Sequence, residues 1–480
     1  MFRYSIFSFC YNGAVESVEE AVRYARSHFA EFVSDLKELA RIPSVSFPGF
    51  DPKHVAASAE AAAALLKKSG LENVEILTLP GAHPYVYGDW LRAPGAPTLL
   101  LYAHHDVQPP GREELWKSPP FEPAERNGRL YGRGTADDKA GVVAHTSAVA
   151  ACLKTLGRLP VNVKLIIEGE EEIGSLHLEE FLRRYRAKLS ADAMILTDTG
   201  NFDVGVPSVT TALRGLASMD VTVRTADHPL HSGMWGGPLP DPVQALAKMI
   251  ASVTDAKGEL AVPGISPKTR KLSAAEKKSL KSLRYPEAKF REQSGLLRRT
   301  RILGKSGEIL ERVWHRPSFS VNAVQASTRK DCANIVNEAA WCHMGVRLAG
   351  DMDPQDVLKR LKAHLKKHAP WGAAVEFSNE TASPAWTTDP AGPAFTAAAK
   401  ALEKGYGHPA VFIGCGGSIP FVGPFAQALG GVPALLIGVE DPYTNPHSEN
   451  ESLHLGDFSN AIASAIYLYE ALASTAGRRS

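Results

Sequence analysis

The sequence predicts an α/β fold built on a mixed sheet and interrupted by an inserted α+β domain. Its 480 residues exceed the length at which one hydrophobic core keeps growing, so we expect two domains. Apolar residues fill consecutive positions in segments such as Leu99–Leu101, which is typical of a strand buried on both faces of a sheet. From about Pro207 the pattern changes to alternation, which is typical of strands with one wet face, and the first pattern returns near Gly392.

The first part of the main domain, residues 1–206, is expected to alternate helices with buried strands. Apolar residues at helical spacing predict a helix over 17–40, and Gly70 is expected to end a second helix over 53–69. The strands predicted next cover 74–79, 85–87 and 99–104. A helix over 139–156, a strand over 161–167, a helix over 176–189 and a strand over 193–197 complete this part.

The inserted domain is predicted to cover residues 207–385. Its elements are expected in the order strand 216–225, helix 242–253, strands 318–326 and 339–348, helix 354–368 and strand 373–377. This β-α-β-β-α-β order is that of a split-βαβ, ferredoxin-like sandwich. Residues 257–315 form a basic insertion, expected to be partly helical near 274–283. Residues 386–480 return to the main domain, with helices over 394–404 and 457–473 around a strand at 434–438.

The composition of the chain limits the kinds of partner and the cellular location that we expect. An apolar content of 44%, a charged content of 22% and a net charge of +1 are ordinary for a globular protein, and they indicate no general attraction to nucleic acid or to a membrane surface. The five cysteines lack a CxxC pair, which favours a reducing, cytoplasmic location. No apolar run reaches the roughly 20 residues that span a bilayer, and the apolar start, Met1–Cys10, lacks the features of a signal peptide.

Imidazole and carboxylate side chains follow the ends of the predicted buried strands. His104 and Asp106 end one strand, the acidic run 168–172 follows another, and Asp198 ends a third. Ligands of open α/β sheets bind beyond the carboxyl ends of the strands. Asp137 and Asp138 stand at a predicted helix start, where capping is an alternative explanation for a carboxylate.

These residue types suit a metal site. Mixed imidazole and carboxylate ligands favour Zn, Mn or Co, whereas carboxylates alone favour Mg or Ca. The adjacent carboxylates of Glu170, Glu171 and Glu172 repel one another unless a cation is near; a solvated loop is the alternative. Glu171 and Glu172 could divide the work, one binding metal and the other acting as the base. Asp106 could accept the imidazole N–H of His104 and fix its tautomer.

Six segments resemble, in chain order, the motifs of the co-catalytic zinc peptidases. They are His104-His-Asp-Val-Gln-Pro109, Gly132-Arg-Gly-Thr-Ala-Asp-Asp-Lys139, Glu168-Gly-Glu-Glu-Glu-Ile-Gly-Ser175, Asp198, Leu230-His-Ser-Gly233 and Pro446-His-Ser448. That family includes carnosinase-like dipeptidases, acetylornithine deacetylase and succinyl-diaminopimelate desuccinylase. The first motif and the segment Gly416-Gly-Ser-Ile-Pro420 are most similar to the dipeptidase branch.

The resemblance implies two divalent metal ions, most simply zinc, with manganese or cobalt as alternatives. One ion would be held by His104, Asp137 and Asp198, and the other by Asp137, Glu172 and His447, so that Asp137 bridges them. The resemblance also implies that Glu171 is the general base, that Asp106 orients His104, and that the Asp137–Asp138 peptide bond is cis.

The inserted domain would be a lid that also forms a homodimer. His231 on it would reach a neighbouring active site and stabilise the oxyanion. Arg347 and the loop Gly416, Gly417 and Ser418 would hold the substrate carboxylate. The function implied is amide-bond hydrolysis in dipeptides or small peptides by metal-activated water with a glutamate base.

Two positions depart from the family pattern. His105 stands where an apolar residue is common, and we interpret it as a neighbour of the ligands and not as one of them. Cys415 replaces a glutamate of the carnosinase-like members, so recognition of a free substrate amino group stays open. The alternative hypotheses are an N-acyl amino acid deacylase of the acetylornithine deacetylase type and a non-catalytic protein that binds acidic partners through residues 257–315.

Overall fold

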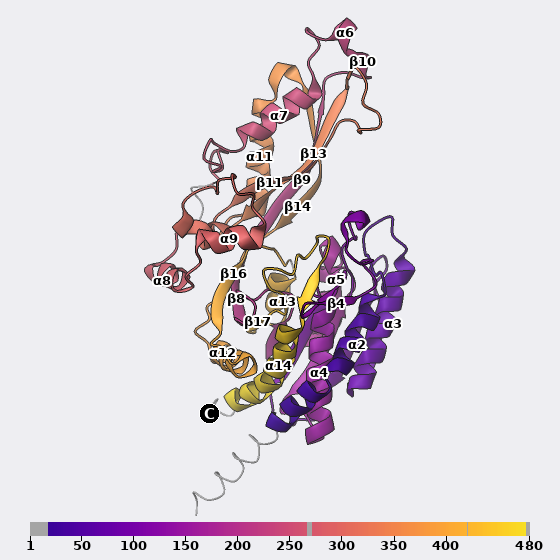
Figure 1. Ribbon diagram of the computed structural model, residues 1–480, viewed down its shortest axis with the longest axis vertical. Helices are drawn as coiled ribbons and strands as arrows, with labels where there is room; N and C mark the ends of the chain where they lie inside the picture. The colour runs from indigo at the N-terminus through magenta and orange to yellow at the C-terminus, as the bar shows by residue number, and fades with distance from the viewer. Residues whose placement is uncertain (1–17, 266–270, 420, 477–480) are drawn as a thin grey trace, which may run out of the picture. The chain divides into compact units, whose positions relative to one another are not determined.

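The computed structural model describes residues 18–265, 271–419 and 421–476 (Figure 1). Met1–Cys10, Pro420 and part of the basic insertion therefore lie outside the described residues. Contacts divide the chain into two compact units. The first unit comprises Met1–Thr211, Asp389–Ile413 and Phe421–Ser480, and the second comprises Ala212–Thr388 and Gly414–Pro420.

A mixed sheet forms the centre of the first unit. Its strands lie in the order β1-β2-β6-β3-β7-β17-β8. The inner strands β6, β3, β7 and β17 are parallel to one another, whereas β1 and β2 are antiparallel additions at one edge. The bounds are β1 Glu72–Leu77, β2 Tyr85–Trp90, β3 Thr98–His104, β6 Asn162–Glu168, β7 Ala193–Leu196, β8 Ser208–Leu213 and β17 Ala434–Leu436; β16 (Val411–Cys415) also pairs with β8.

Helices cover this sheet and share its core. Helix α4 is buried along nearly all of its first four turns, because its small and apolar residues let it pack on every side. Figure 1 shows α4 beside α14, and the two helices are in contact. The helices are α2 Phe29–Ala40, α3 Pro52–Ser69, α4 Lys139–Leu156, α5 Leu178–Leu189, α12 Pro393–Tyr406, α13 Val422–Ala428 and α14 Leu455–Ala476. A small sheet of β4 (Ala124–Arg126), β5 (Arg129–Tyr131) and β18 (Ser452–His454) lies apart.

The helix predicted over 17–40 is interrupted at His28. Residues 18–27 are helical, His28 forms a turn, and α2 begins at Phe29. The His28 ring stacks on Tyr24, and its Nδ1 lies 3.0 Å from the Tyr24 carbonyl oxygen. The same carbonyl also accepts the backbone N–H of His28 at 3.0 Å, so the helical hydrogen bond is kept across this turn.

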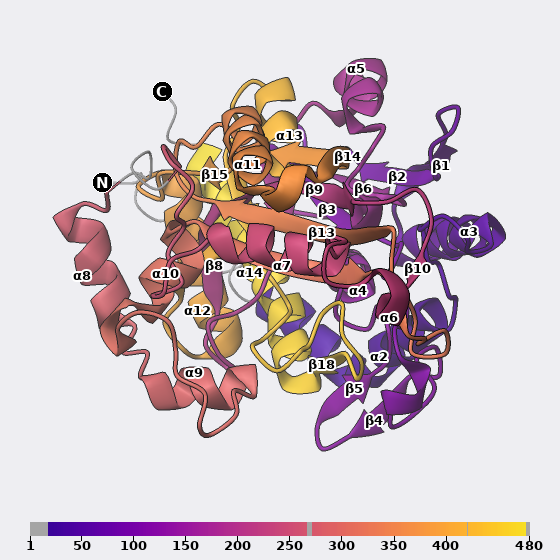
Figure 2. The ribbon, with the colours of Figure 1, turned by 90° about the horizontal axis from the view of Figure 1, so that it is seen from above.

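The second unit contains an antiparallel sheet in the order β11-β13-β9-β14. Helices α7 and α11 pack against one face, where the alternate residues Met219, Val221 and Met344 are buried (Figure 2). This order and the two helices confirm the predicted ferredoxin-like fold. The bounds are β9 Gly215–Arg224, α7 Pro242–Ser252, β11 Ser318–Gln325, β13 Ala339–Leu348, α11 Pro354–His368 and β14 Ala374–Ser383.

Short elements join this framework. The described part of the basic insertion contains three α-helices where the sequence predicted one near 274–283, and none of the two-residue strands was predicted. A strand of two residues is too short to show any periodicity. The short elements are β10 Leu230–His231, α6 Ser232–Trp235, α8 Ala274–Ser282, α9 Glu287–Ser294, α10 Ile309–His315, β12 Ile335–Val336 and β15 Trp386–Thr387. None of the helices in the described ranges combines the length and the hydropathy needed to cross a bilayer.

Candidate metal centre

The parallel strands bring polar side chains to one edge of the first unit's sheet. β3 ends at His104, and its neighbours β6 and β7 run parallel to it. Glu171 and Glu172 follow the end of β6 in a short 3-10 turn, and Asp198 lies two residues beyond β7. The carboxyl ends of parallel strands meet at the same edge, so these side chains converge as the strand pattern predicts.

Two triads of potential metal ligands lie at this edge. One consists of His104, Asp137 and Asp198, and the other of Asp137, Glu172 and His447. Within each triad the ligand atoms lie within 4.8 Å of one another. Oδ1 of Asp137 lies 3.1 Å from Nε2 of His104, and its Oδ2 lies 3.1 Å from Nε2 of His447. Asp137 therefore belongs to both triads, with one carboxylate oxygen toward each.

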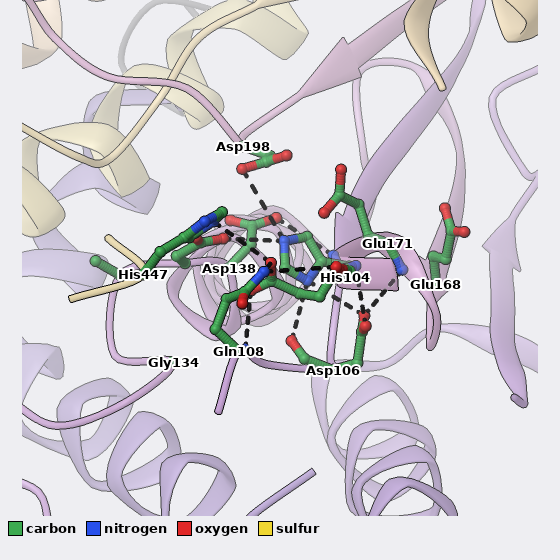
Figure 3. A network of polar contacts seen from close by, with 12 residues as sticks. His104, Asp106, Gln108, Gly134, Asp138, Glu168, Glu171, Asp198 and His447 are labelled. Carbon is green, nitrogen blue, oxygen red and sulfur yellow. Dashed lines mark hydrogen bonds and ion pairs between the residues drawn. The ribbon is translucent and has the colours of Figure 1, made fainter. Parts of the chain in front are cut away.

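Figure 3 shows His104 between Asp198 and Asp106, with His447 on one side and Glu171 on the other. Nε2 of His104 lies 4.0 Å from Oδ1 of Asp198, and Nε2 of His447 lies 3.4 Å from Oε2 of Glu172. His447 has a φ of +60°, which is uncommon for a non-glycine residue and typical of functional sites. The donor set of imidazoles and carboxylates, with one shared carboxylate, fits two divalent transition-metal ions.

Asp106 contacts both His104 and the turn that carries Glu171 and Glu172. Nδ1 of His104 contacts the Asp106 backbone oxygen at 3.1 Å and lies 3.4 Å from its Oδ1, so Nε2 is left to face the triads. The Asp106 carboxylate also accepts the backbone N–H groups of Glu171 at 3.2 Å and of Glu172 at 3.1 Å, and the Ser46 hydroxyl at 2.6 Å. Only the contact with His104 was predicted from the sequence.

Gln108 positions Glu172. Its backbone N–H donates to Oε1 of Glu172 at 3.1 Å, and its side-chain Nε2 donates to Oε2 at 2.7 Å. Sequence reasoning gave Gln108 no role. The signal was its place in the same motif as His104 and Asp106, four residues beyond the strand end.

The loop that carries Asp137 is organised by Glu451, which sequence reasoning also missed. The buried Glu451 carboxylate accepts the backbone N–H groups of Gly134, Ala136 and Asp137 at 3.0 to 3.2 Å. It also pairs with the buried Arg133 guanidinium at 2.7 Å. A buried carboxylate with these partners fixes the backbone of the loop, and with it the position of Asp137.

Asp138 is the N-cap residue of α4, but its side chain makes no capping hydrogen bond. Its Oδ2 accepts the backbone N–H of His104 at 3.3 Å instead. Capping thus does not explain why a carboxylate stands at this helix start. The Asp137–Asp138 peptide bond is cis.

Burial and mutual repulsion perturb the carboxyl groups of the site. Burial, with the charges of Asp106 and Asp137, raises the pKa of Glu171 to about 7. Burial also raises the pKa values of Glu172 and Asp198 well above their usual range. Asp137 differs, because its contacts with His104 and His447 outweigh burial and lower its pKa. Cations bound here would relieve the repulsion among the buried carboxylates.

His105 lies outside both triads. Its Nε2 contacts the Pro84 carbonyl oxygen at 3.0 Å, and burial lowers its pKa to about 4. The position fits a buried neutral imidazole.

The remaining candidates belong to the second unit. His231 is exposed at the end of β10, and its Nδ1 accepts the backbone N–H of Gly233 at 3.1 Å. Nη1 of Arg347 donates to the Ser418 hydroxyl at 2.8 Å, so β13 and the loop 416–418 come together. Cys415, directly before this loop, accepts the backbone N–H of Gly417 through its sulfur at 3.3 Å.

A mixed α/β sheet with two triads of potential metal ligands at one edge, which share an aspartate, is typical of a dinuclear metallohydrolase. A profile of the peptidase family M20/M25/M40 matches residues 100–472, and the chain belongs to this family. The cysteinylglycine-S-conjugate dipeptidase of Corynebacterium striatum is 33% identical over 440 residues, which cover 90% of this chain and 94% of that protein. The Cys-Gly metallodipeptidase of Schizosaccharomyces pombe is 30% identical, over 90% of this chain and 93% of the relative.

Solved structures agree with this assignment. Human carnosine dipeptidase 1 has a TM-score of 0.87 and 26% sequence identity, with 95% of this chain and 99% of that chain covered. The dipeptidase Dug1p of Saccharomyces cerevisiae has a TM-score of 0.85 at the same identity, with 95% and 98% covered. The predicted resemblance to the dipeptidase branch is therefore confirmed.

Proposed function

We propose that this protein is a dinuclear metallodipeptidase that hydrolyses the peptide bond of dipeptides and other small peptides. The observation that carries the proposal is the pair of ligand triads that share Asp137, with Glu171 beside them. The names of the similar proteins, Cys-Gly and β-Ala-His dipeptidases, support a dipeptide as the substrate.

His104, Asp137 and Asp198 would hold one ion, and Asp137, Glu172 and His447 the other. Zinc is the ion we propose, because imidazole and carboxylate ligands suit it, with manganese and cobalt as alternatives. When bound, a pair of divalent ions supplies polarisation of the scissile carbonyl and acidification of the attacking water.

Glu171 would act as the general base and then as the general acid. Its carboxylate would accept the proton of the attacking water and later donate it to the leaving nitrogen. Desolvation, which raises the pKa of Glu171, favours this exchange because the group can hold the proton between the two steps. Asp106 would position both His104 and the Glu171 backbone through the contacts described above.

Arg347 and the loop Gly416, Gly417 and Ser418 would bind the carboxylate of the substrate. A guanidinium group and backbone N–H groups suit a carboxylate, and the Arg347–Ser418 hydrogen bond joins them in one site. His231 would stabilise the oxyanion of a neighbouring protomer in a homodimer formed through the inserted domain. The exposed position of His231 and the resemblance of Leu230-His-Ser-Gly233 to the family motif support this assignment.

A cytoplasmic location is also proposed. Its support is that Cys152, Cys332, Cys342 and Cys415, the cysteines in the described part of the chain, form no disulfide bond.

Turnover of a mixed panel on protein of measured metal content tests the function. The panel contains Cys-Gly, β-Ala-His and neutral dipeptides on one side and N-acetyl and N-succinyl amino acids on the other. We expect hydrolysis of the dipeptides that stops on chelation and returns on addition of Zn²⁺ or Mn²⁺. Hydrolysis of the N-acyl amino acids alone would favour the deacylase hypothesis. The observation that supports this alternative is that position 415 is a cysteine and not a carboxylate.

A further inference from the structure

Two arginine side chains meet at the loop 414–418 of the second unit. Arg214 lies directly before β9, and Arg347 lies on β13, where it pairs with Leu216 across the sheet. Ser418 joins them, because its hydroxyl accepts from Nη1 of Arg347 at 2.8 Å and donates to the Arg214 carbonyl oxygen at 2.6 Å. Both side chains are half-buried.

The Arg214 guanidinium is held on two of its three nitrogens. Nε donates to the Gly416 carbonyl oxygen at 3.0 Å, and Nη1 donates to the Ser318 hydroxyl at 2.9 Å. Its backbone N–H also contacts the carbonyl oxygens of Cys415 and Gly417. No hydrogen-bond acceptor for Nη2 is found in the part of the chain that the structure describes. The group is therefore fixed in place with one nitrogen available.

Neither arginine has a carboxylate partner within the ranges 18–265, 271–419 and 421–476. Burial and repulsion by Arg347 lower the pKa of Arg214 to about 10, and burial lowers the pKa of Arg347. The Cys415 sulfur is near enough to act on both guanidinium groups, where its charge would raise the pKa of each, but it is not a carboxylate. Two adjacent, partly desolvated positive charges without a carboxylate partner in the described residues form a site for more than one negative charge.

We propose that Arg214 is a second carboxylate-binding residue beside Arg347, so that the enzyme prefers substrates whose C-terminal residue is Asp or Glu. The proposal rests on the proposed dipeptidase function. Arg347 binds the α-carboxylate, and the free Nη2 of Arg214 binds the side-chain carboxylate of the same residue. A substrate with one carboxylate leaves one of the two guanidinium groups uncompensated, and a dianionic one neutralises both.

Isosteric substrates test the preference. Ala-Glu and Ala-Gln differ by one charge, as do Ala-Asp and Ala-Asn. We expect kcat/KM of the metal-loaded wild type to be about tenfold or more higher for the acidic member of each pair, since a hydrogen bond to a charged group is stronger than one to a neutral group. Arg214→Gln should bring the ratio close to one, mainly through KM of the acidic substrate. Arg360→Gln, which removes a guanidinium from α11 of the same unit, should leave the ratio unchanged.

A gain of charge provides the reciprocal test. Cys415→Glu places a carboxylate beside the two guanidinium groups and should reduce the preference for acidic substrates. Cys332→Glu adds the same charge at an exposed site of the second unit and should not. The variant Arg214→Lys distinguishes the effect of the positive charge at this position from the effect of the guanidinium hydrogen bonds to the loop. It keeps the charge but loses the planar fork, so a falling rate on all substrates with a retained ratio would show that the guanidinium also positions the loop.

Binding without turnover separates this proposal from the proposed function. Calorimetry would compare glutarate with its monoamide, glutaramate, on the metal-loaded protein. Tighter binding of glutarate that Arg214→Gln removes, at unchanged metal content, supports the site even if no dipeptide is hydrolysed. Equal kcat/KM for Ala-Glu and Ala-Gln together with equal binding of the two acids would overturn the proposal, and dipeptide hydrolysis would then stand without it.

Discussion

The Asp106 carboxylate accepts the backbone N–H of Glu171 at 3.2 Å, across 65 positions of the chain. The same carboxylate lies 3.4 Å from Nδ1 of His104. One side chain therefore sets the position of a proposed metal ligand at the end of β3 and of the proposed base after β6. Loss of this group is expected to disturb two parts of the site together.

Asp106→Ala should lower kcat about 10- to 100-fold, because His104 and the Glu171 turn both lose their orienting partner. Bound metal should fall as well, since the ligand ring is then free to turn. Metal content by mass spectrometry and steady-state kinetics measure the two effects. Asp192→Ala is the matched control, because Asp192 also accepts a backbone N–H of β3, at Thr98, but at the opposite end of the strand. An Asp106→Ala enzyme with normal kcat would show that the contact has no catalytic value.

Glu171→Gln should lower kcat by about 100-fold or more with both ions retained, because the amide cannot accept the proton of the attacking water. Glu179→Gln, on the exposed side of α5, should have no effect. A Glu171→Gln enzyme that turns over at the wild-type rate would exclude Glu171 as the base.

The pH dependence of kcat/KM should show the ionisation of this base. Protonated Glu171 cannot accept a proton, so the rate falls as the pH falls through its pKa. Burial raises that pKa to about 7, and bound cations act in the opposite direction because they favour the carboxylate. The acid limb is therefore expected between pH 4.5 and 7 on the metal-loaded enzyme. A rate independent of pH down to the limit of stability would contradict this expectation.

The shared aspartate predicts a difference in metal stoichiometry. Asp137 belongs to both triads, whereas His447 and Asp198 each belong to one. Asp137→Ala should lose both ions, and His447→Ala should lose the ion of its own triad more readily than the other. Metal content after dialysis against a weak chelator, with Asp35→Ala as a surface control paired to Lys68, measures the outcome. Retention of both ions by Asp137→Ala would show that the carboxylate does not bridge.

Protomer mixing tests the role proposed for His231. His231→Ala should slow turnover with the metal content unchanged, while His228→Ala, three residues earlier and paired with Asp227, should not. The slow His231→Ala and inactive Glu171→Ala proteins, mixed under conditions that exchange subunits, should recover about a quarter of the wild-type rate, because half of the dimers then contain one intact site. If the mixture stays inactive while subunits demonstrably exchange, His231 does not act across the interface.

The sequence predicted the site best where an imidazole or carboxylate side chain follows a buried strand. His104 and Asp198 follow runs of buried residues, and parallel strands carry such ends to one edge of the sheet, so their convergence could be predicted. Glu451 and Gln108 could not be identified in this way. They act through hydrogen bonds with backbone N–H groups or with another side chain, and these contacts form only after distant loops fold together.

Arg214 was missed for a similar reason. Its partners lie on β11 and on the loop 414–418, about 100 and 200 positions away along the chain. The short strands and α13 were missed because few residues carry little periodic signal. At the turn of His28 the ring stacks on Tyr24, and the spacing of apolar residues carries no signal of such a turn.

The buried His145 of α4 predicts a measurable loss of stability in acid. Its Nε2 lies 3.2 Å from the Tyr102 carbonyl oxygen, and burial lowers its pKa to about 4. The unfolded state binds the proton near pH 6.5, so protonation favours unfolding below that pH. The neutral buried imidazole contributes fully to the free energy of unfolding above pH 6.5, and about 3 kcal/mol of that free energy is lost as the pH falls toward 4.

His145→Gln keeps a donor for the Tyr102 carbonyl but cannot titrate, so the free energy of unfolding of this variant should fall less steeply over that interval. Denaturant titrations at pH 7, 5.5 and 4.5 measure the difference, with His54→Gln on the exposed side of α3 as the control. Parallel pH profiles for wild type and His145→Gln would mean that the buried imidazole ionises as readily as one in water.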